Sequence, residues 1–303
     1  NQITNDGAYT YSYDAEGNTT ANSTGAGDDS DYLYDHRNQL TSITKEVNST
    51  EELRVEYKYD VFGRRIQEDK WTSASGTVTT KFAYDNGANV LADLDSSNNL
   101  SMRYVRPDGV DALGARVSSS GTIAWYLTDR QGSVVALTDN SGHVQRTISY
   151  DGFGNVTSHT GSNHADRYQY TGREWDADTG LQYNRARYYN PSTGRWISKD
   201  PIGFRAGDAN LYRYVGNNST NATDPSGKFL LTAGVFFVLS AIALQTSTRS
   251  LNDYSKAQDI LAKPLSETTQ ADLERYQELV QSARLWGVAA NVATPAAQAV
   301  ALA

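Results

Sequence analysis

A short pattern of hydrophobic and polar residues recurs along the first half of the chain. Two hydrophobic residues, usually both aromatic, are separated by one position and followed by Asp, with a Gly or Asn within the next four positions. The clearest copies begin at Tyr11, Tyr32, Tyr57, Phe82 and Ile148. In the first four copies the Asp residues are 21, 25 and 25 positions apart, so the period is loose but real. An internal repeat of this length is typical of stacked architectures.

Each copy predicts a β-hairpin. Residues i and i+2 of a strand lie on one face, so both rings of a Tyr-x-Tyr pair face the same side. The Asp opens a turn by accepting backbone N–H groups, and the Gly or Asn adopts the positive φ that the turn needs. A single hairpin cannot bury its apolar face, so neighbours must stack on it. We therefore expect a mainly β fold of stacked antiparallel hairpins, with the Tyr-x-Tyr pairs facing inward onto neighbouring turns.

The pattern continues in a weaker form beyond the fourth copy. Residues 125–139 predict two strands joined by a turn from Asp129 to Gly132, and Ser141 and Gly142 form the next turn. A further strand is expected over residues 144–150, directly before Asp151. We therefore expect residues 1–227 to form antiparallel hairpins in a curved, stacked sheet.

Composition agrees with a wall of strands better than with a thick aliphatic core. The chain has 20 Tyr against 7 Phe, 5 Trp and 1 Met, and Tyr suits half-buried strands because its hydroxyl can reach a polar partner. The net charge of −8 offers no surface for phosphates, so nucleic acid is not an expected partner of the folded part. The absence of Cys excludes disulfides and thiolate metal sites. Asn1 in place of Met, and the Ala-rich end, indicate a fragment of a longer protein.

Most candidate chemistry can be set aside. None of the four histidines (His36, His143, His159 and His164) lies in a metalloprotease motif, and no phosphate-binding loop or nucleophile elbow occurs. The segment from Asp176 to Gly180 resembles half of a calcium loop but lacks its third carboxyl position and its closing Glu. We interpret its Asp residues as turn caps. No cofactor or metal site is expected.

Two copies of Asp-Pro-x-Gly, beginning at Asp200 and Asp224, bracket a segment rich in Tyr and Asn. Either copy alone predicts a type I turn. Pro holds the preceding Asp in an extended conformation and has no N–H of its own. The carboxylate therefore stays available for another partner.

These two motifs, together with the Arg- and Tyr-rich run from Tyr183 to Trp196, resemble the core-associated domain of Rhs proteins and Tc toxin C subunits, with teneurins as distant relatives. The resemblance covers roughly residues 1–227. It implies YD/RHS repeats over 1–167, an RHS repeat-associated core domain over 168–227, and a variable tail over 228–303. It also implies a shell that encloses a C-terminal cargo, commonly a toxin.

In that family the core domain is an aspartyl self-protease that cuts just after the second Asp-Pro-x-Gly. The resemblance maps its catalytic carboxylates onto Asp200 and Asp224, and an assisting arginine onto Arg187. Two carboxyl groups in one pocket share a proton, so one acts as base on water and the other as acid. The arginine either holds one carboxylate ionised or orients the scissile carbonyl. This chain departs from the family by carrying Lys228 where Leu is usual, and Ser219-Thr220 in place of an Asp-Pro.

The composition changes after Gly227, and the pattern predicts an α-helical tail. The segment from Phe229 to Leu244 carries no charge over its 16 residues, which gives a helix of ~24 Å, short of the ~30 Å of a bilayer core. A capping box begins at Thr269, and residues 285–303 are again apolar. A bilayer, the shell wall or the second apolar helix can each cover the first one; we favour a hairpin of the two helices.

Three functions follow as hypotheses. The first is the encapsulating shell of a secreted effector that cleaves itself once. The second is a non-cleaving cell-surface or structural shell whose tail is anchored in a membrane, and the third is a tail that is itself membrane-active. The expected partners are the chain's own C-terminal cargo, immunity or secretion-system proteins, and a membrane at the 229–244 segment. The expected location is outside the cell or in its envelope.

Overall fold

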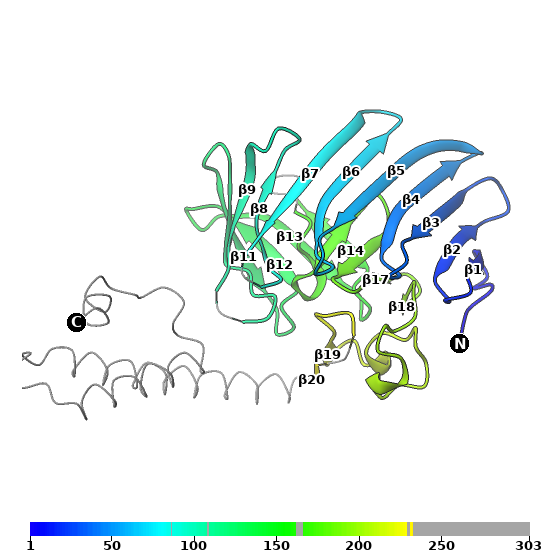
Figure 1. Ribbon diagram of the computed structural model, residues 1–303. Helices are drawn as coiled ribbons and strands as arrows, with labels where there is room; N and C mark the ends of the chain where they lie inside the picture. Colours follow the sequence, from blue (N-terminus) through cyan, green and yellow to red (C-terminus); the bar gives the residue numbers. More distant parts are fainter. Residues whose placement is uncertain (86, 108, 162–165, 229–230, 233–303) are drawn as a thin grey trace, which may run out of the picture. The chain divides into compact units, whose positions relative to one another are not determined.

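The computed structural model describes residues 1–232 except 86, 108, 162–165 and 229–230 (Figure 1). Within them, fourteen strands form one antiparallel sheet in which each strand pairs only with its sequence neighbours. These strands are β1 (Thr10–Tyr13), β2 (Thr19–Ser23), β3 (Asp29–Tyr34), β4 (Leu40–Val47), β5 (Thr50–Tyr59), β6 (Arg65–Thr72), β7 (Gly76–Tyr84), β8 (Val90–Leu94), β9 (Leu100–Val105), β10 (Ala115–Ser118), β11 (Ile123–Thr128), β12 (Val134–Thr138), β13 (Val144–Tyr150) and β14 (Val156–Thr160). The predicted run of antiparallel hairpins, which was expected to reach residue 227, is confirmed as one sheet over residues 10–160.

One turn geometry recurs at the repeated Asp residues. In the turn between β3 and β4, Asp35 Oδ1 accepts the N–H of Arg37 at 2.8 Å and that of Gln39 at 2.9 Å, while Asn38 takes a φ of 59°. The same bond from Asp Oδ1 to the N–H four residues on occurs at Asp14, Asp60, Asp85, Asp95, Asp129, Asp139 and Asp151. The predicted role of Asp as the opener of each turn is therefore confirmed.

A β-bulge precedes these turns and accounts for the curvature of the sheet. The pairing register shifts at the residue just before the turn Asp, at Tyr13, Tyr34, Tyr59 and Tyr84. A bulge bends its strand and increases the local twist. Because it recurs in successive hairpins, the bends add up along the sheet.

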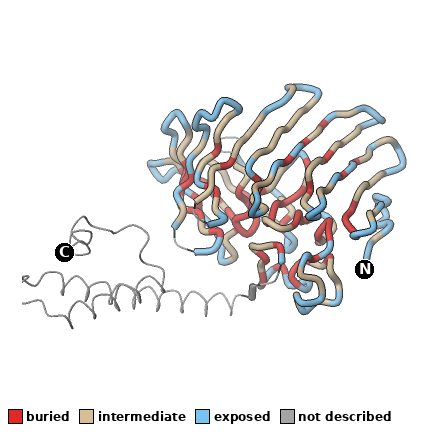
Figure 2. Tube along the Cα trace, viewed as in Figure 1, coloured by how far each residue is buried: buried red, intermediate tan, exposed pale blue. Residues whose placement is uncertain are grey.

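Residues 168–227 cover the face of the sheet onto which the Tyr-x-Tyr rings point. Their four-stranded sheet comprises β15 (Glu174–Asp176), β16 (Leu181–Asn184), β17 (Arg187–Asn190) and β18 (Arg195–Trp196). Tyr32 and Tyr57 are buried in one cluster with Tyr183 and Tyr188. Figure 2 shows the buried residues along the lower part of the large sheet in this view, with the hairpin tips at the top exposed. The rings face inward and contact neighbouring turns as predicted. The hydroxyls of Tyr59, Tyr84 and Tyr150 donate to carbonyl oxygens just after the turn of the preceding hairpin, those of Leu40, Arg65 and Val134. β16 and β17 supply a further covering surface that the repeat pattern did not predict.

Buried ion pairs join the two sheets. Arg65 of β6 is 4% exposed, and its Nη2 lies 2.5 Å from Glu174 Oε2 of β15. Arg167 Nε lies 3.3 Å from the same oxygen, and Arg167 also pairs with Asp93 of β8. The Arg65 guanidinium stacks 4.4 Å from the centre of the Tyr183 ring. The charges are therefore both paired and packed, as buried charges must be.

The turn from Asp176 to Gly180 has the capping role that was predicted for it. Asp176 Oδ1 accepts the N–H of Asp178 at 2.9 Å, and Lys70 Nζ lies 3.0 Å from a carboxylate oxygen of each Asp. In the part of the chain that the structure describes, no group of three His, Asp or Glu side chains is placed to hold a metal ion.

The predicted α-helical tail lies outside the described residues, apart from Lys228 and a short strand. That strand, β20 (Leu231–Thr232), pairs with β19 (Ala222–Thr223). The helix expected from Phe229 is therefore wrong at residues 231–232. The described residues contain three short 3₁₀ segments, η1 (Tyr170–Gly172), η2 (Gly203–Ala206) and η3 (Val215–Asn217). Within the same ranges, no helix has the length and apolar character needed to cross a bilayer.

We expect Glu174 to stabilise the contact between the sheets. Burial would raise the pKa of Glu174, but Arg167 and Arg65 outweigh it and bring that pKa from 4.5 down to about 2. The stabilising contribution of the carboxylate is therefore fully present above pH 4.5 and is lost as the pH falls through about 2. Glu174→Gln removes the carboxylate that the two guanidinium groups share and leaves Arg167 with Asp93 and Arg65 with Glu68. The loss of this buried charge should lower the free energy of unfolding at pH 7 by about 3–5 kcal/mol.

Urea unfolding of both chains from pH 7 to pH 2 checks this, and the deficit of the variant should shrink toward pH 2. Glu56→Gln is the control, because its side chain is 57% exposed and lies 4.0 Å from Arg54. Equal stability of the Glu174→Gln and wild-type chains at pH 7 would contradict the role of this ion pair.

Candidate active site

The two Asp-Pro-x-Gly motifs meet at one arginine. Arg187 of β17 places its Nη2 2.8 Å from Asp200 Oδ2 and 3.3 Å from Asp224 Oδ2. The two carboxylate oxygens cannot be farther apart than the sum of these distances. All three residues are buried, with exposed fractions of 4%, 9% and 3%. The structure therefore brings together all three site residues predicted from the sequence.

The Arg187 side chain is held on every side. Its guanidinium carbon lies 4.1 Å from the centre of the Trp196 ring, and Nη1 donates to the carbonyl oxygen of Leu211 at 3.2 Å. Its Nε donates to the carbonyl oxygen of Gly227. Because the guanidinium is planar and each nitrogen is engaged, the group is fixed relative to both carboxylates and to the Gly227 carbonyl.

Four consecutive residues, 184–187, hold four consecutive carbonyl groups, 224–227. The donors lie on the turn between β16 and β17, and each serves the residue forty positions later. The donors are Asn184 Nδ2 to Asp224 O (2.8 Å), Arg185 Nη1 to Pro225 O, Ala186 N to Ser226 O (3.2 Å) and Arg187 Nε to Gly227 O. We call this set of four bonds the clamp. The clamp fixes the backbone of residues 224–227 through hydrogen bonds to four successive carbonyl groups. A protease binds the backbone of a peptide substrate through contacts of the same kind.

Gly227 lies where no other residue fits. Its φ is +69°, and a Cβ added there would be 2.5 Å from the carbonyl oxygen of Asn184 and 2.9 Å from the backbone nitrogen of Arg187. Both are backbone atoms that cannot move aside. Gly203 of the first motif also has a positive φ of +60°, but an added Cβ would meet nothing within 4 Å. The steric demand for glycine is therefore confined to the second motif.

The peptide bond between Gly227 and Lys228 is contacted at both ends. Its carbonyl oxygen accepts from Arg187. Its N–H, on Lys228, donates to Asp224 Oδ1 at 3.2 Å and to Ser226 Oγ at 3.1 Å. Hydrolysis of an amide needs a donor at the carbonyl oxygen and a group that can pass a proton to the nitrogen. Arg187 is such a donor, and a carboxyl group and a hydroxyl group contact the nitrogen.

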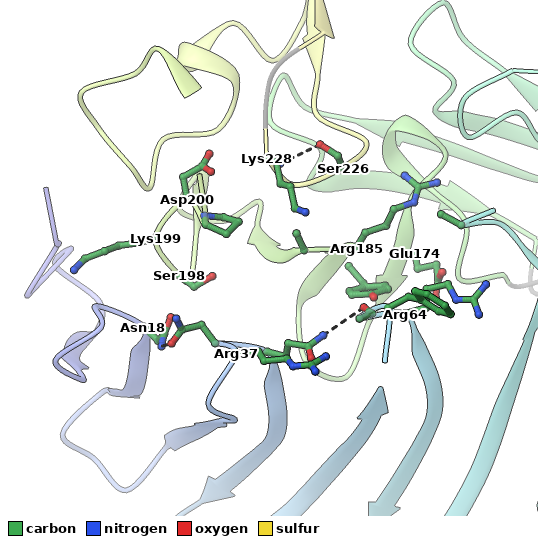
Figure 3. Close-up of a pocket in the computed structure, with 18 of the residues that line it drawn as sticks. Asn18, Arg37, Arg64, Glu174, Arg185, Ser198, Lys199, Asp200, Ser226 and Lys228 are labelled. Atoms are coloured by element: carbon green, nitrogen blue, oxygen red, sulfur yellow. Dashed lines mark hydrogen bonds between the residues drawn. The ribbon is translucent and has the colours of Figure 1, made fainter. Parts of the chain in front are cut away.

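A cavity of about 600 Å³ opens onto one side of this bond (Figure 3). Asp200, Ser226 and Lys228 line it, and the turns of the large sheet form the opposite wall with Arg37 and Arg64. Burial raises the pKa of Asp200, against the opposing charges of Arg187 and Lys228. Asp224 and Arg187 do not line the cavity, so Asp200 is the carboxylate that water can reach.

The two motifs differ in their turns. In the first, Gly203 N–H donates to Asp200 O at 2.9 Å and Ile202 N–H to Asp200 Oδ1 at 3.0 Å, which confirms the predicted turn. In the second, Asn184 takes the carbonyl of Asp224. Sequence reasoning did not single out Asn184, Ala186 or Ser226. The available indication was a polar residue at the end of a buried strand, because Asn184 closes β16 and is itself fully buried.

Comparison with known proteins places residues 1–220 in a family. The model of the teneurin YD-shell matches residues 1–220. The tRNA3(Ser)-specific nuclease WapA of Bacillus spizizenii is 33% identical over 235 residues, which are 76% of this chain and 10% of that protein. Double-stranded DNA deaminase toxin A of Burkholderia cenocepacia is 30% identical over 242 residues, 72% and 17%. Toxin protein Tse5 of Pseudomonas aeruginosa is 27% identical over 264 residues, 77% and 20%. The chain thus spans a tenth to a fifth of these relatives.

Solved structures show the same fold. The crystal structure of TcdB2-TccC3 matches 72% of this chain and 13% of its own with a TM-score of 0.54, at 21% sequence identity. That of TcdB2-TccC3-Cdc42 matches 73% and 13% with a TM-score of 0.54, at 22% identity. At this level of identity the likeness concerns the fold alone.

Proposed function

The chain belongs to the teneurin YD-shell family, and on that premise we propose that it is part of a toxin shell that encloses a C-terminal cargo and cuts itself once, between Gly227 and Lys228. The observation that carries the proposal is the clamp, which presents this bond with Arg187 at its carbonyl and Asp224 at its nitrogen. The names of the relatives, a tRNA nuclease, a DNA deaminase toxin and a toxin protein, favour a toxin as cargo. Immunity and secretion-system proteins are the matching partners, and the location is outside the cell or in its envelope.

The reaction is an aspartyl hydrolysis in which the two carboxyl groups share one proton. Asp200, ionised and facing the cavity, takes a proton from water as the water oxygen attacks the carbonyl carbon of Gly227. Arg187 Nε stabilises the negative charge that develops on the carbonyl oxygen. Asp224 supplies a proton to the nitrogen of Lys228 as the C–N bond breaks. The products are a carboxyl group on Gly227 and an amine on Lys228.

The assignment of roles follows from position. Asp200 is the base because it lines the cavity from which water reaches the bond. Asp224 is the acid because its Oδ1 lies 3.2 Å from the nitrogen that must be protonated. Since the substrate is the chain's own backbone and the clamp already orders it, no entropy is lost at the moment of reaction.

One residue, Lys228, favours a second candidate function. Lys228 stands where the resembling family carries Leu, and this departure favours a shell that never cuts and whose tail stays attached. In that case the tail, from Phe229 onward, is the segment that would anchor the protein in a membrane. The mass of the chain after folding separates the two functions.

The dyad is tested by removing each carboxylate without removing its volume. Asp200→Asn and Asp224→Asn should each slow cutting by about 10²–10⁴-fold, because each removes one proton-transfer group. Pulse-labelled full chain, followed by gel and intact mass, gives the rate; circular dichroism should be unchanged. Asp208→Asn is the control. The Asp208 carboxylate lies 2.8 Å from Arg213 Nη2 and takes no part in the site. A wild-type chain that stays uncut establishes the inert shell, and a variant that cuts at the wild-type rate removes that residue from the mechanism.

The two motif glycines form a matched pair. Gly203→Ala and Gly227→Ala both place Ala at a positive φ, a strain of about 1–2 kcal/mol. Only at Gly227 does the new Cβ collide with the backbone of the clamp. The Gly227→Ala chain should therefore remain uncut, while Gly203→Ala should cut within about threefold of the wild-type rate. Equal cutting by the two variants would show that the clamp does not hold the reacting bond.

The pH dependence follows from Asp200, whose pKa burial raises above the ordinary 3.8. The base must be ionised, so the rate of cutting should fall as the pH drops through that raised pKa, tenfold per pH unit below it. Chain refolded from urea into buffers between pH 3 and pH 8 gives the profile. A rate that does not change between pH 8 and pH 3 would exclude an ionised carboxylate as the base.

A further inference from the structure

The variable position of the second Asp-Pro-x-Gly motif is Ser226. Its hydroxyl contacts both Asp224, the proposed acid, and the nitrogen of Lys228, the proposed leaving group. We propose that Ser226 is a positioning residue that relays the proton from Asp224 to the nitrogen of Lys228, an inference that rests on the proposed self-cleavage. It assigns a part in the reaction to a position that the Asp-Pro-x-Gly pattern leaves open.

Three contacts define the arrangement. Ser226 Oγ donates to Asp224 Oδ1 at 3.0 Å. It also accepts the N–H of Lys228 at 3.1 Å, the bond drawn between Lys228 and Ser226 in Figure 3. The direct contact from that N–H to Asp224 Oδ1 is longer, at 3.2 Å. The backbone of Ser226 is itself fixed, because its carbonyl accepts from Ala186 in the clamp. The hydroxyl is therefore held against both the proton source and the atom that needs the proton.

The relay is needed because the nitrogen changes its character during the reaction. In the intact peptide its lone pair is delocalised and its N–H points at Ser226 and Asp224. Once water has added to Gly227, the nitrogen is a pyramidal amine with a free lone pair. A hydroxyl has one donor and two acceptor sites. When Asp224 holds the shared proton, the bond between the two groups reverses, and Ser226 receives that proton while it gives its own to this nitrogen.

The step balances. The bond between Gly227 C and Lys228 N breaks, and its electron pair stays on nitrogen. Nitrogen gains the Ser226 proton, Ser226 regains one from Asp224, and Asp224 ends as a carboxylate. The proton taken from water stays on Asp200. No further reactant is required.

Two other turns of the same chain can be compared with the turn at Asp224. The first motif has Ile202 at the corresponding position, and Asp200 Oδ1 there accepts only the N–H of Ile202 among the bonds described. The turn that begins Asn190-Pro191-Ser192 repeats the local bond, since Ser192 Oγ donates to Asn190 Oδ1 at 2.7 Å. It holds no clamped peptide. Ser192→Ala therefore removes the same kind of turn bond without touching the relay.

The test compares the rate of cutting in full-length chains that carry Ser226→Ala, Ser226→Thr, Ser226→Val or Ser192→Ala. Thr keeps the hydroxyl and Val has nearly the shape of Thr without it. We expect Ser226→Ala and Ser226→Val to cut at least tenfold more slowly, and Ser226→Thr and Ser192→Ala to stay within about threefold of wild type. Near-ultraviolet circular dichroism and the melting temperature verify the fold of each chain.

A second readout separates proton relay from support of the turn. The cavity beside Ser226 admits small acids, so acetate buffer raised in concentration at constant pH and ionic strength should accelerate the Ser226→Ala chain and leave wild type unchanged. A Ser226→Ala or Ser226→Val chain that cuts at the wild-type rate overturns the relay while the proposed self-cleavage stands. Slow cutting by Ser226→Ala without acetate dependence also overturns it and leaves a structural role. A wild-type chain that never cuts overturns both proposals.

Discussion

The architecture depends on one constraint, which is that a sheet of two-stranded hairpins cannot bury its own inner face. The tyrosines of the repeat all point to that face, and a long meander has no second sheet of its own to cover them. Residues 168–227 supply the cover through β16 and β17, and the buried pair of Arg65 with Glu174 joins the two layers. The segment that follows the repeats is thus packed onto the first hairpins of the repeat region.

The candidate site is a product of that packing. The turn that leads from β16 into β17 carries the clamp, and β17 carries Arg187 into a region from which water is largely excluded. A guanidinium buried with two carboxylates leaves the trio with a net negative charge if both are ionised. Sharing one proton between the acids resolves this, and the same proton is the one that hydrolysis requires at the leaving nitrogen. The compensation of the buried charges and the proton supply for the proposed hydrolysis therefore both depend on the arrangement around Arg187.

Local features of the fold could be predicted from the sequence, and features that depend on distant contacts could not. The turn at Asp35 was predictable because its bonds reach only four residues ahead. The turn at Asp95 was missed because no aromatic pair precedes it, although its Oδ1 makes the same bond. The packing of Tyr57 against Tyr188 joins residues far apart in the chain, so no periodicity could indicate it.

The candidate site also combines local features, which the sequence can predict, with distant contacts, which it cannot. Asp200, Asp224 and Arg187 were assigned through a family resemblance, because the spacing of two turn motifs does not bring carboxylates together. Their meeting point depends on how β17 and the second motif cross. The clamp could not be predicted for the same reason, since all four of its acceptors are backbone carbonyl groups and one of its four donors is a backbone N–H. Ser226 occupies a position that the motif leaves open, and only its distances from Asp224 and Lys228 single it out.

The most direct test of the account is to fold the wild-type chain in water enriched in ¹⁸O and to measure the masses of the two fragments. Hydrolysis between Gly227 and Lys228 predicts an N-terminal fragment that ends at Gly227 with one ¹⁸O in its new carboxyl group, and a C-terminal fragment that begins at Lys228 with none. An uncut chain, or a cut at any other bond, would contradict the claim that the clamp presents this peptide to the two carboxylates.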